Sequence, residues 1–296
     1  MATPEDLEDY QHHIEGRGIY DERNRVNDLT GREWKYATKS VIPKGYPPDM
    51  QHDRRSEHGG QKPPRLCAEL IGRFSKAGDR VLDPFAGVGG TLLGASLCAH
   101  EGTGLREAVG FERVERWVEC YEAVLEAENA ERRERGEPPL DPQTLRQGDC
   151  LELVEELATD SIDCLVTDVP YWTMDSREQT RNERRTRDSK LSAFDPDAEQ
   201  SSKEEWLADL GAAFAAFERV LREGAYAVVF IGDMYREQSY EFLSADLARE
   251  IQDSTGLTLR ANLVWYDPTK DLHVYGYPYA FVPSMVHQNV LVFRAD

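Results

Sequence analysis

From residue 62 onward, short apolar runs alternate with segments of helical spacing, and this alternation constrains the fold most strongly. Strands are predicted at 80–83, 108–112, 145–149, 162–168 and 225–231, and helices at 66–74, 90–100, 114–133, 151–157, 206–221 and 240–251. Two late apolar runs, 259–266 and 287–293, are expected to form a closing pair of strands. Such alternation predicts an α/β fold with a doubly wound, mostly parallel sheet. Ligands of such sheets bind at the carboxyl ends of the strands.

The charge balance limits the partners of this chain. Its 296 residues carry 35 Lys and Arg against 55 Asp and Glu, a net charge of −20, and only eight of the basic residues are lysine. We interpret this excess of acid as adaptation to a salt-rich cytoplasm, with an ordinary acidic protein as the alternative. The charge disfavours a protein that coats nucleic acid non-specifically, because such binding depends on neutralising phosphates. The net charge does not exclude a local basic groove that binds nucleic acid.

The chain is expected to be cytoplasmic. The N-terminus is acidic and lacks an apolar core, which argues against a signal peptide. No apolar run approaches the roughly 20 residues of a membrane span. The five cysteines form no C-x-x-C pair and are predicted to be reduced core thiols. The histidines show no metal-ligand spacing, so no metal is expected.

Composition divides the chain into two parts. Residues 1–60 are polar and rich in charge, Gly, Pro and His, and are expected to form an extended arm with one short helix. Residues 61–296 carry the predicted sheet, interrupted by a polar insertion at about 173–203.

A glycine-rich turn joins the first predicted strand to its helix. The string runs Asp83-Pro84-Phe85-Ala86-Gly87-Val88-Gly89-Gly90-Thr91. A dinucleotide site would need G-x-G-x-x-G, and Leu92 occupies the third glycine position. The string resembles the cofactor loop of S-adenosylmethionine-dependent methyltransferases. This resemblance implies S-adenosylmethionine as cofactor, with contacts from Asp83, Pro84, Phe85, Ala86, Gly87, Gly89 and Thr91.

Two strand-end acids fit such a cofactor. Glu112 ends the second strand, where an acid of a nucleoside-binding sheet accepts both ribose hydroxyls. Asp149, followed by Cys150, ends the third strand and is expected to accept from the adenine amino group. The alternative for both acids is an ordinary solvated strand end. Lys62 and Pro63 resemble the upstream motif of the same family, which implies contact with the methionine end of the cofactor.

The chemistry is expected at the end of the fourth strand, in Thr167-Asp168-Val169-Pro170-Tyr171-Trp172. The string resembles the Asp-Pro-Pro-Tyr/Trp tetrapeptide of methyltransferases that act on exocyclic amino groups. An aromatic amine is a poor nucleophile because its lone pair is delocalised into the ring. Two acceptors on its hydrogens, Asp168 and the Val169 carbonyl, would localise that pair. Tyr171 is expected to stack on the extracted base, and Trp172 to line the same pocket.

The tetrapeptide departs from the family at Val169, where proline is usual. The required acceptor is a main-chain carbonyl and survives this change, and Pro170 still favours an extended Val169. An ordinary strand-end turn is the alternative. Carbon-5 methylation of cytosine would need a cysteine nucleophile after this strand, and none is present.

Contacts to nucleic acid are expected outside the sheet. The insertion is locally basic, and a phosphate clamp is predicted from Arg177, Arg181, Arg184, Arg185 and Arg187, with a mixed-charge loop as the alternative. The arm at 1–60 is a second candidate for target contact. An aromatic-rich stretch at 275–283 is expected either to wall the base pocket or to pack over the sheet edge.

From residue 62 to 294 the chain thus resembles amino-group DNA methyltransferases. The resemblance implies a catalytic domain over 61–296 with a seven-stranded sheet of the class I methyltransferase type and an antiparallel closing strand. It implies methylation of DNA, with adenine N6 favoured and cytosine N4 as the alternative. An RNA amino-group methyltransferase and a non-catalytic cofactor-binding scaffold stay open. The chain lacks a P-D…E-x-K nuclease pattern, so it is not expected to cleave DNA itself. A separate restriction endonuclease is one possible partner.

Overall fold

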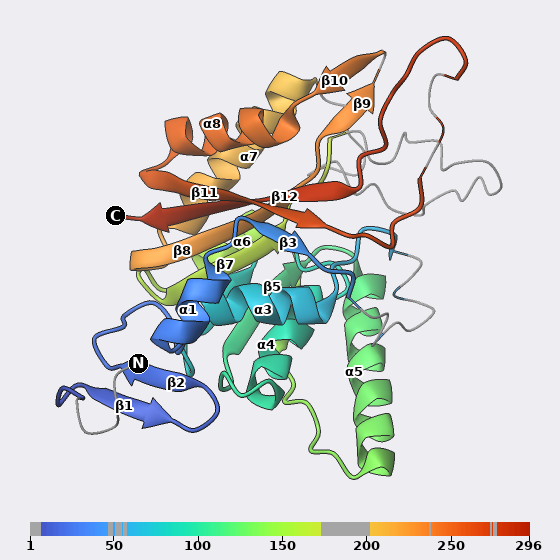
Figure 1. Ribbon diagram of the computed structural model, residues 1–296. Helices are drawn as coiled ribbons and strands as arrows, with labels where there is room; N and C mark the ends of the chain where they lie inside the picture. Colours follow the sequence, from blue (N-terminus) through green and yellow to red (C-terminus); the bar gives the residue numbers. More distant parts are fainter. Residues whose placement is uncertain are drawn as a thin grey trace.

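The computed structural model describes residues 7–46, 50, 55, 58–172, 202–236, 238–272, 274 and 277–296. Its main element is an eight-stranded sheet in the order β3-β11-β12-β8-β7-β4-β5-β6 (Figure 1). These strands are β3 (Val41–Pro43), β4 (Arg80–Asp83), β5 (Glu107–Glu112), β6 (Thr144–Gln147), β7 (Ile162–Asp168), β8 (Leu221–Ile231), β11 (Leu257–Tyr266) and β12 (His287–Ala295). Neighbours pair in parallel except where β12 lies antiparallel between β8 and β11. The predicted doubly wound sheet with an antiparallel closing strand is confirmed.

Helices cover both faces of the sheet, as its two hydrophobic clusters require (Figure 1). One face packs against α3 (Pro64–Phe74), α4 (Gly90–His100) and α5 (Glu115–Arg135). The other packs against α6 (Cys150–Glu155), α7 (Lys203–Glu218) and α8 (Leu243–Ser254). Buried residues dominate α4 because it is built from small and apolar side chains, whereas α3 and α8 bury one stripe.

The strand order places a topological switch point at β4. The chain leaves β4 to form β5 and β6 on one side, then returns to form β7 and β8 on the other. Crossovers diverge there, so the carboxyl ends of β4 and β7 border an open crevice in which such sheets bind ligands. Asp83 ends β4 and Asp168 ends β7, so the topology brings both predicted acids to this crevice.

The sheet has eight strands because the N-terminal segment adds β3. Residues 41–43 pair in parallel with β11 at residues 264–266. Seven strands, with no strand in the arm, were expected from the sequence, since three residues carry too little periodicity to be recognised. The arm also contains a hairpin of β1 (Gln11–Ile14) and β2 (Gly18–Asp21), followed by the expected short helix α1 (Gly31–Ala37).

Several other boundaries differ from the predicted ones, and two of the shifts follow from strand pairing. The helix expected at 240–251 begins at Leu243, because residues 239–241 form β10 (Ser239–Glu241) against β9 (Met234–Arg236). The strand expected at 225–231 begins at Leu221. Both shifts reflect pairing between strands, which overrides local preference.

The hairpin and α1 pack at the amino ends of the strands, away from the crevice. Lys76, just before β4, donates hydrogen bonds to the Asn24 carbonyl (2.7 Å) and the Tyr20 hydroxyl (2.8 Å). The Asn27 amide donates to the Arg73 carbonyl at the end of α3 (2.7 Å). Hydrogen bonds therefore hold residues 10–37 at the amino ends of the strands, opposite the carboxyl ends where the ligand site is predicted.

The aromatic stretch at 275–283 is largely exposed where the structure describes it. Tyr277, Tyr279 and Phe281 are 81%, 95% and 95% exposed. These three side chains do not pack over the sheet edge.

Among the described helices, none is both long and apolar enough to cross a bilayer.

The buried Arg106 provides a test of how the arm is anchored. Its guanidinium is fully buried, donates to the Ser75 carbonyl (2.7 Å) and the Gly104 carbonyl (2.7 Å), and pairs with Asp28 of the arm (3.3 Å). We expect Arg106→Leu to lower the free energy of unfolding by about 3 kcal/mol, because buried carbonyls and a carboxylate lose their donor.

The matched control is Arg222→Leu, which removes an ion pair to Asp163 from a half-exposed arginine. This change should cost less than about 1 kcal/mol. Urea denaturation of both variants measures the difference, and equal losses would contradict a special role of Arg106.

Candidate active site

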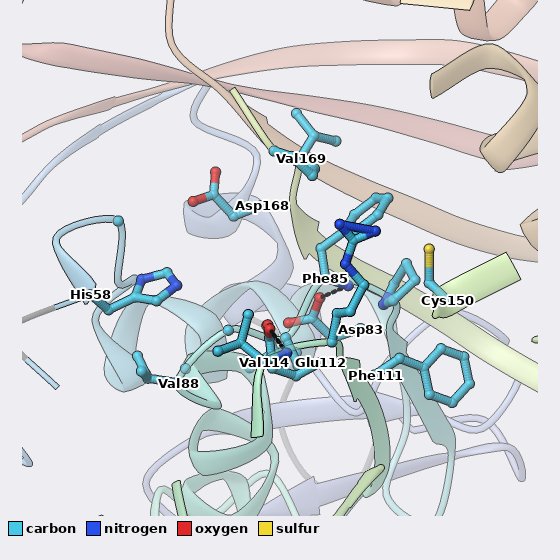
Figure 2. Close-up of a pocket in the computed structure, with 18 of the residues that line it drawn as sticks. His58, Asp83, Phe85, Val88, Phe111, Glu112, Val114, Cys150, Asp168 and Val169 are labelled. Carbon is cyan, nitrogen blue, oxygen red and sulfur yellow. Dashed lines mark hydrogen bonds between the residues drawn. The ribbon is translucent and has the colours of Figure 1, made fainter. Parts of the chain in front are cut away.

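A pocket opens at the carboxyl ends of β4, β5 and β7, and most of the predicted site residues line it (Figure 2). From the prediction it contains Lys62, Asp83, Pro84, Phe85, Ala86, Gly87, Thr91, Glu112, Asp149, Cys150, Asp168, Val169, Pro170 and Tyr171. Figure 2 shows Asp168 and Val169 above Asp83 and Glu112, with His58 on one side and Cys150 on the other. Five segments that are distant in the sequence thus share one cavity.

Asp83 lies at the floor of this pocket and is almost completely buried, with 4% of its surface exposed. Its Oδ1 accepts hydrogen bonds from the Thr167 hydroxyl (2.6 Å) and the Phe85 amide (3.2 Å). The first bond joins β4 to β7 across the switch point. Burial raises the pKa of Asp83 to about 6, because the charged form loses solvation that these hydrogen bonds only partly replace.

The glycine-rich turn is packed tightly against neighbouring segments. Gly87 and Gly89 have φ values of +51° and +74°, which side-chain-bearing residues rarely adopt. A Cβ on Gly87 would lie 3.1 Å from the His58 ring, and one on Gly90 would lie 2.9 Å from the Lys62 carbonyl. These positions therefore require glycine, and Gly87 and Gly90 line the pocket without side chains.

Glu112 lines the pocket at the end of β5. Its Oε1 accepts from the Val114 amide (2.8 Å), and burial raises its pKa. Asp149 was expected to end the next strand, but β6 ends at Gln147 and Asp149 is the N-cap of α6. Its Oδ1 accepts from the Leu151 amide (2.8 Å), and its Oδ2 lies 3.8 Å from Arg113. Both carboxylate oxygens of Asp149 therefore interact with neighbouring protein groups, one with the first turn of α6 and the other with Arg113.

Asp168 at the end of β7 faces an ammonium group. Lys62 Nζ donates to Asp168 Oδ2, and the two side chains are only 8% and 18% exposed. Burial raises the pKa of Asp168, and the Lys62 charge opposes the rise. Asp168 Oδ1 is buried and has no hydrogen-bond partner among the described residues. Buried acceptors are rarely left unpaired, so such an atom marks a place for a ligand donor.

The remaining tetrapeptide residues have distinct environments. The Val169 side chain is 1% exposed and packs in the hydrophobic core. The Pro170 carbonyl accepts from the Trp206 indole (2.9 Å). The Tyr171 hydroxyl accepts from the Gln288 amide (2.9 Å), and its ring packs beside Gly232. The tyrosine ring is therefore held by two later segments of the chain.

Three predicted residues do not line the pocket. Pro63 is the N-cap of α3, and Gly89 is the N-cap of α4 with its outer side against the Tyr121 ring. Trp172 packs partly against the core, and the Arg236 guanidinium lies 4.6 Å from its ring centre. The predicted phosphate contacts, Arg177, Arg181, Arg184, Arg185 and Arg187, lie outside the described residues.

Several lining residues were not predicted from the sequence. They are His58, Gly60, Gln61, Val88, Gly90, Phe111, Arg113, Val114 and Gly148. The glycine pair that follows His58 and closely precedes Lys62 signals a turn and could have extended the predicted upstream motif. Gln288 had no local signal, because only the sheet brings it to Tyr171 from 117 residues away.

The pocket carries a net negative charge. Its carboxylates are Asp83, Glu112, Asp149 and Asp168, and its permanent cations are Lys62 and Arg113. Lys62 is paired with Asp168, and Arg113 lies 3.8 Å from Asp149, so the four carboxylates outnumber these two cations. Such a lining favours a cationic ligand. The described residues contain no cluster of His, Cys, Asp and Glu suited to a metal ion.

A family model described as DNA methylase matches residues 12–123 of this chain. The match includes the glycine-rich turn and Glu112 and ends before Asp168. The resemblance inferred from the motifs is thus confirmed over that segment. A search of curated proteins gave no match to this sequence.

Solved structures give more distant likenesses. The chain is similar to TrmN from Thermus thermophilus, with 15% identity, a TM-score of 0.49, and coverage of 84% of this chain and 53% of that one. It is also similar to a second Thermus thermophilus protein, described as a DNA modification methylase and solved with S-adenosylmethionine, with 20% identity, a TM-score of 0.35, and coverage of 50% and 53%. A methyltransferase from Aquifex aeolicus shows 14% identity and a TM-score of 0.44, with coverage of 83% and 100%. This chain spans about half the length of the first two proteins.

The packing of the glycine-rich turn can be tested at Gly89. A Cβ there would lie 2.9 Å from Tyr121 Cγ, and Tyr121 is too deeply buried to move aside. We expect Gly89→Ala to lower the free energy of unfolding by about 3 kcal/mol, from backbone strain and overpacking together.

Gly102→Ala is the matched control, because Gly102 has nearly the same φ (+77°) and nothing within 4 Å of the position that a Cβ would take. Strain alone should cost about 1 kcal/mol there. Thermal or urea unfolding of the two variants measures the gap, and identical stabilities would show that Tyr121 does not constrain the turn.

The raised pKa of Asp83 predicts a pH dependence of stability. Folding favours the protonated acid between the unfolded value of about 4 and the folded value of about 6, so stability from this group falls as pH rises through that window. Asp83→Asn keeps an oxygen acceptor and removes the charge. We expect the variant to gain up to about 3 kcal/mol relative to wild type between pH 4 and pH 7.

Urea midpoints of the two proteins across this range check the prediction. A constant difference between them would mean that Asp83 titrates as an ordinary exposed acid.

Proposed function

We propose that this protein transfers a methyl group from S-adenosylmethionine to an exocyclic base amine in DNA, with adenine N6 as the favoured target. The observation that carries the proposal is the buried, unpartnered Asp168 Oδ1 at the mouth of a pocket built around a glycine-rich turn, in the part of the chain that the structure describes. An acceptor of this kind suits an amino group, which brings N–H donors.

The pocket residues fit the proposed cofactor. S-adenosylmethionine carries a sulfonium, an ammonium and a carboxylate, and thus one net positive charge, which suits the negative lining. In the proposal the bare glycine turn allows close approach, and Glu112 accepts from the ribose hydroxyls. Asp149 is assigned to the adenine amino group through the oxygen that now faces Arg113, since its other oxygen caps α6.

Asp168 has two tasks in the proposed reaction. As a carboxylate it accepts one N–H of the target amine, while the Val169 carbonyl accepts the other, and these bonds localise the nitrogen lone pair. The cofactor supplies an electrophilic methyl group: the new N–C bond forms as the C–S bond breaks, and S-adenosylhomocysteine leaves. The methylated nitrogen then loses one proton, which Asp168 accepts and passes to water. Alignment and charge placement supply the rate enhancement.

Tyr171 is assigned to hold the base beside Asp168. Its hydroxyl is tied to Gln288 on β12, and Gly232 leaves room for the edge of its ring. A ring fixed in this way can stack on a base that has left its helix. Methylation of cytosine N4 uses the same acceptors, so the identity of the base is an outcome of the experiment below.

The deciding experiment uses cofactor labelled in the methyl group, incubated with unmethylated DNA and, separately, with RNA. Mass spectrometry of the nucleosides then identifies the product. We expect N6-methyladenine from DNA. N4-methylcytosine would move the assignment to the alternative base, a labelled RNA nucleoside would change the polymer, and absence of label in every nucleic acid would refute the proposal.

The matching variant is Asp168→Ala. We expect turnover to fall at least about 10³-fold, because the amine loses the acceptor that localises its lone pair. Binding of S-adenosylmethionine, measured by calorimetry, should persist because the glycine turn and Glu112 are intact. Asp163→Ala, at the other end of β7, serves as the control with near wild-type turnover. Substantial turnover by Asp168→Ala would remove this carboxylate from the mechanism.

A further inference from the structure

Lys62 reaches the reaction centre rather than only the cofactor loop. The residue precedes α3, and its ammonium lies on Asp168, 106 positions later in the chain. Only 8% of the lysine side chain is exposed. An ammonium is seldom buried to this extent without a defined partner, and here the partner is the carboxylate assigned to the target amine.

The lysine is held at both ends. Its main-chain carbonyl accepts from the Arg55 guanidinium (2.6 Å), and Arg55 is itself completely buried. Its Nζ lies 5.8 Å from the ring centre of Tyr171 and 5.4 Å from that of Phe230, where aromatic faces attract a cation. The position of the ammonium is therefore set by the surrounding structure and not by chance contact of a flexible side chain.

The contact with Lys62 gives the two carboxylate oxygens of Asp168 different environments. Oδ2 is engaged by Lys62, whereas Oδ1 is buried and has no partner within the part of the chain that the structure describes. Burial raises the pKa of Asp168, whereas the charge and hydrogen bond of Lys62, and to a smaller extent the Tyr171 side chain, lower it. Without that charge the pKa of Asp168 would rise further, and a larger fraction of the carboxyl group would be protonated and lose acceptor strength.

We infer that Lys62 is a positioning residue for methyl transfer: its ammonium keeps Asp168 ionised with Oδ2 engaged, so that Oδ1 faces the target amine. The inference rests on the proposed function and assigns Lys62 a task that differs from contact with the methionine end of the cofactor. Lys62 touches no reacting atom, and it acts through Asp168.

The two tasks for Lys62 predict different measurements. A lysine that binds the cofactor carboxylate would, when removed, weaken binding of S-adenosylmethionine and leave the pH dependence of turnover unchanged. A lysine that keeps Asp168 ionised would, when removed, leave cofactor affinity unchanged and move the rising limb of kcat to higher pH, because turnover needs the deprotonated acid.

The experiment compares Lys62→Met, Lys62→Arg and wild type at saturating cofactor and DNA, from about pH 5 to about pH 9. We expect Lys62→Met to lose about 10²-fold in kcat at neutral pH, with partial recovery toward alkaline pH. Lys62→Arg keeps the charge and should keep the wild-type limb. Lys44→Met is the matched control, since Lys44 is a half-exposed lysine paired with Glu69 away from the pocket.

A second readout does not depend on turnover. Carbon-13 NMR of the aspartate carboxyl groups, with Asp168→Asn to assign the signal, reports the ionisation of Asp168 directly. We expect its titration to lie at higher pH in Lys62→Met than in wild type. An unmoved titration overturns the inference, as does an unmoved kcat limb with weakened cofactor binding. If wild type methylates no nucleic acid, the proposed function fails, and the NMR titration still decides the effect of Lys62 on Asp168.

Discussion

The burial of carboxylates at one switch point of the sheet is the constraint on which the rest of this site depends. Asp83 and Asp168 end neighbouring strands, and the Thr167 hydroxyl binds Asp83 across the gap between them. Charged groups taken out of water need compensation, and the structure supplies it locally: hydrogen bonds for Asp83 and an ammonium for Asp168. The same desolvation makes both groups sensitive to a ligand that brings positive charge or N–H donors.

The glycine-rich turn and the upstream segment form one unit around these acids. His58 packs on Gly87, the Lys62 carbonyl packs on Gly90, and Tyr121 packs behind Gly89. These contacts fix the turn, and Gly87 and Gly90 still line the pocket. The segment at 58–62 therefore has two roles, since it packs against the turn and also places the Lys62 side chain on Asp168.

The two ends of the sheet have separate tasks. At the amino ends of the strands, the arm is fastened through Lys76 and the buried Arg106. At the carboxyl ends lie the pocket, the β9–β10 hairpin and the exposed Tyr277, Tyr279 and Phe281. Loops at the second end can vary without disturbing the anchoring at the first, which is the usual division in open α/β sheets.

The βα alternation was sufficient to predict the fold class and the placing of Glu112 and Asp168 at strand ends, because these follow from local periodicity and from the geometry of parallel strands. The glycine-rich turn with Asp83 was predicted to bind a ligand because it resembles a methyltransferase cofactor loop. The local pattern carried no sign of β3, of the β9–β10 hairpin or of Gln288 beside Tyr171. Those features arise from pairing that tertiary contacts select. The Lys62–Asp168 contact belongs with them: both residues stood out in the sequence, yet their ion pair exists only because the fold carries one to the other and buries both.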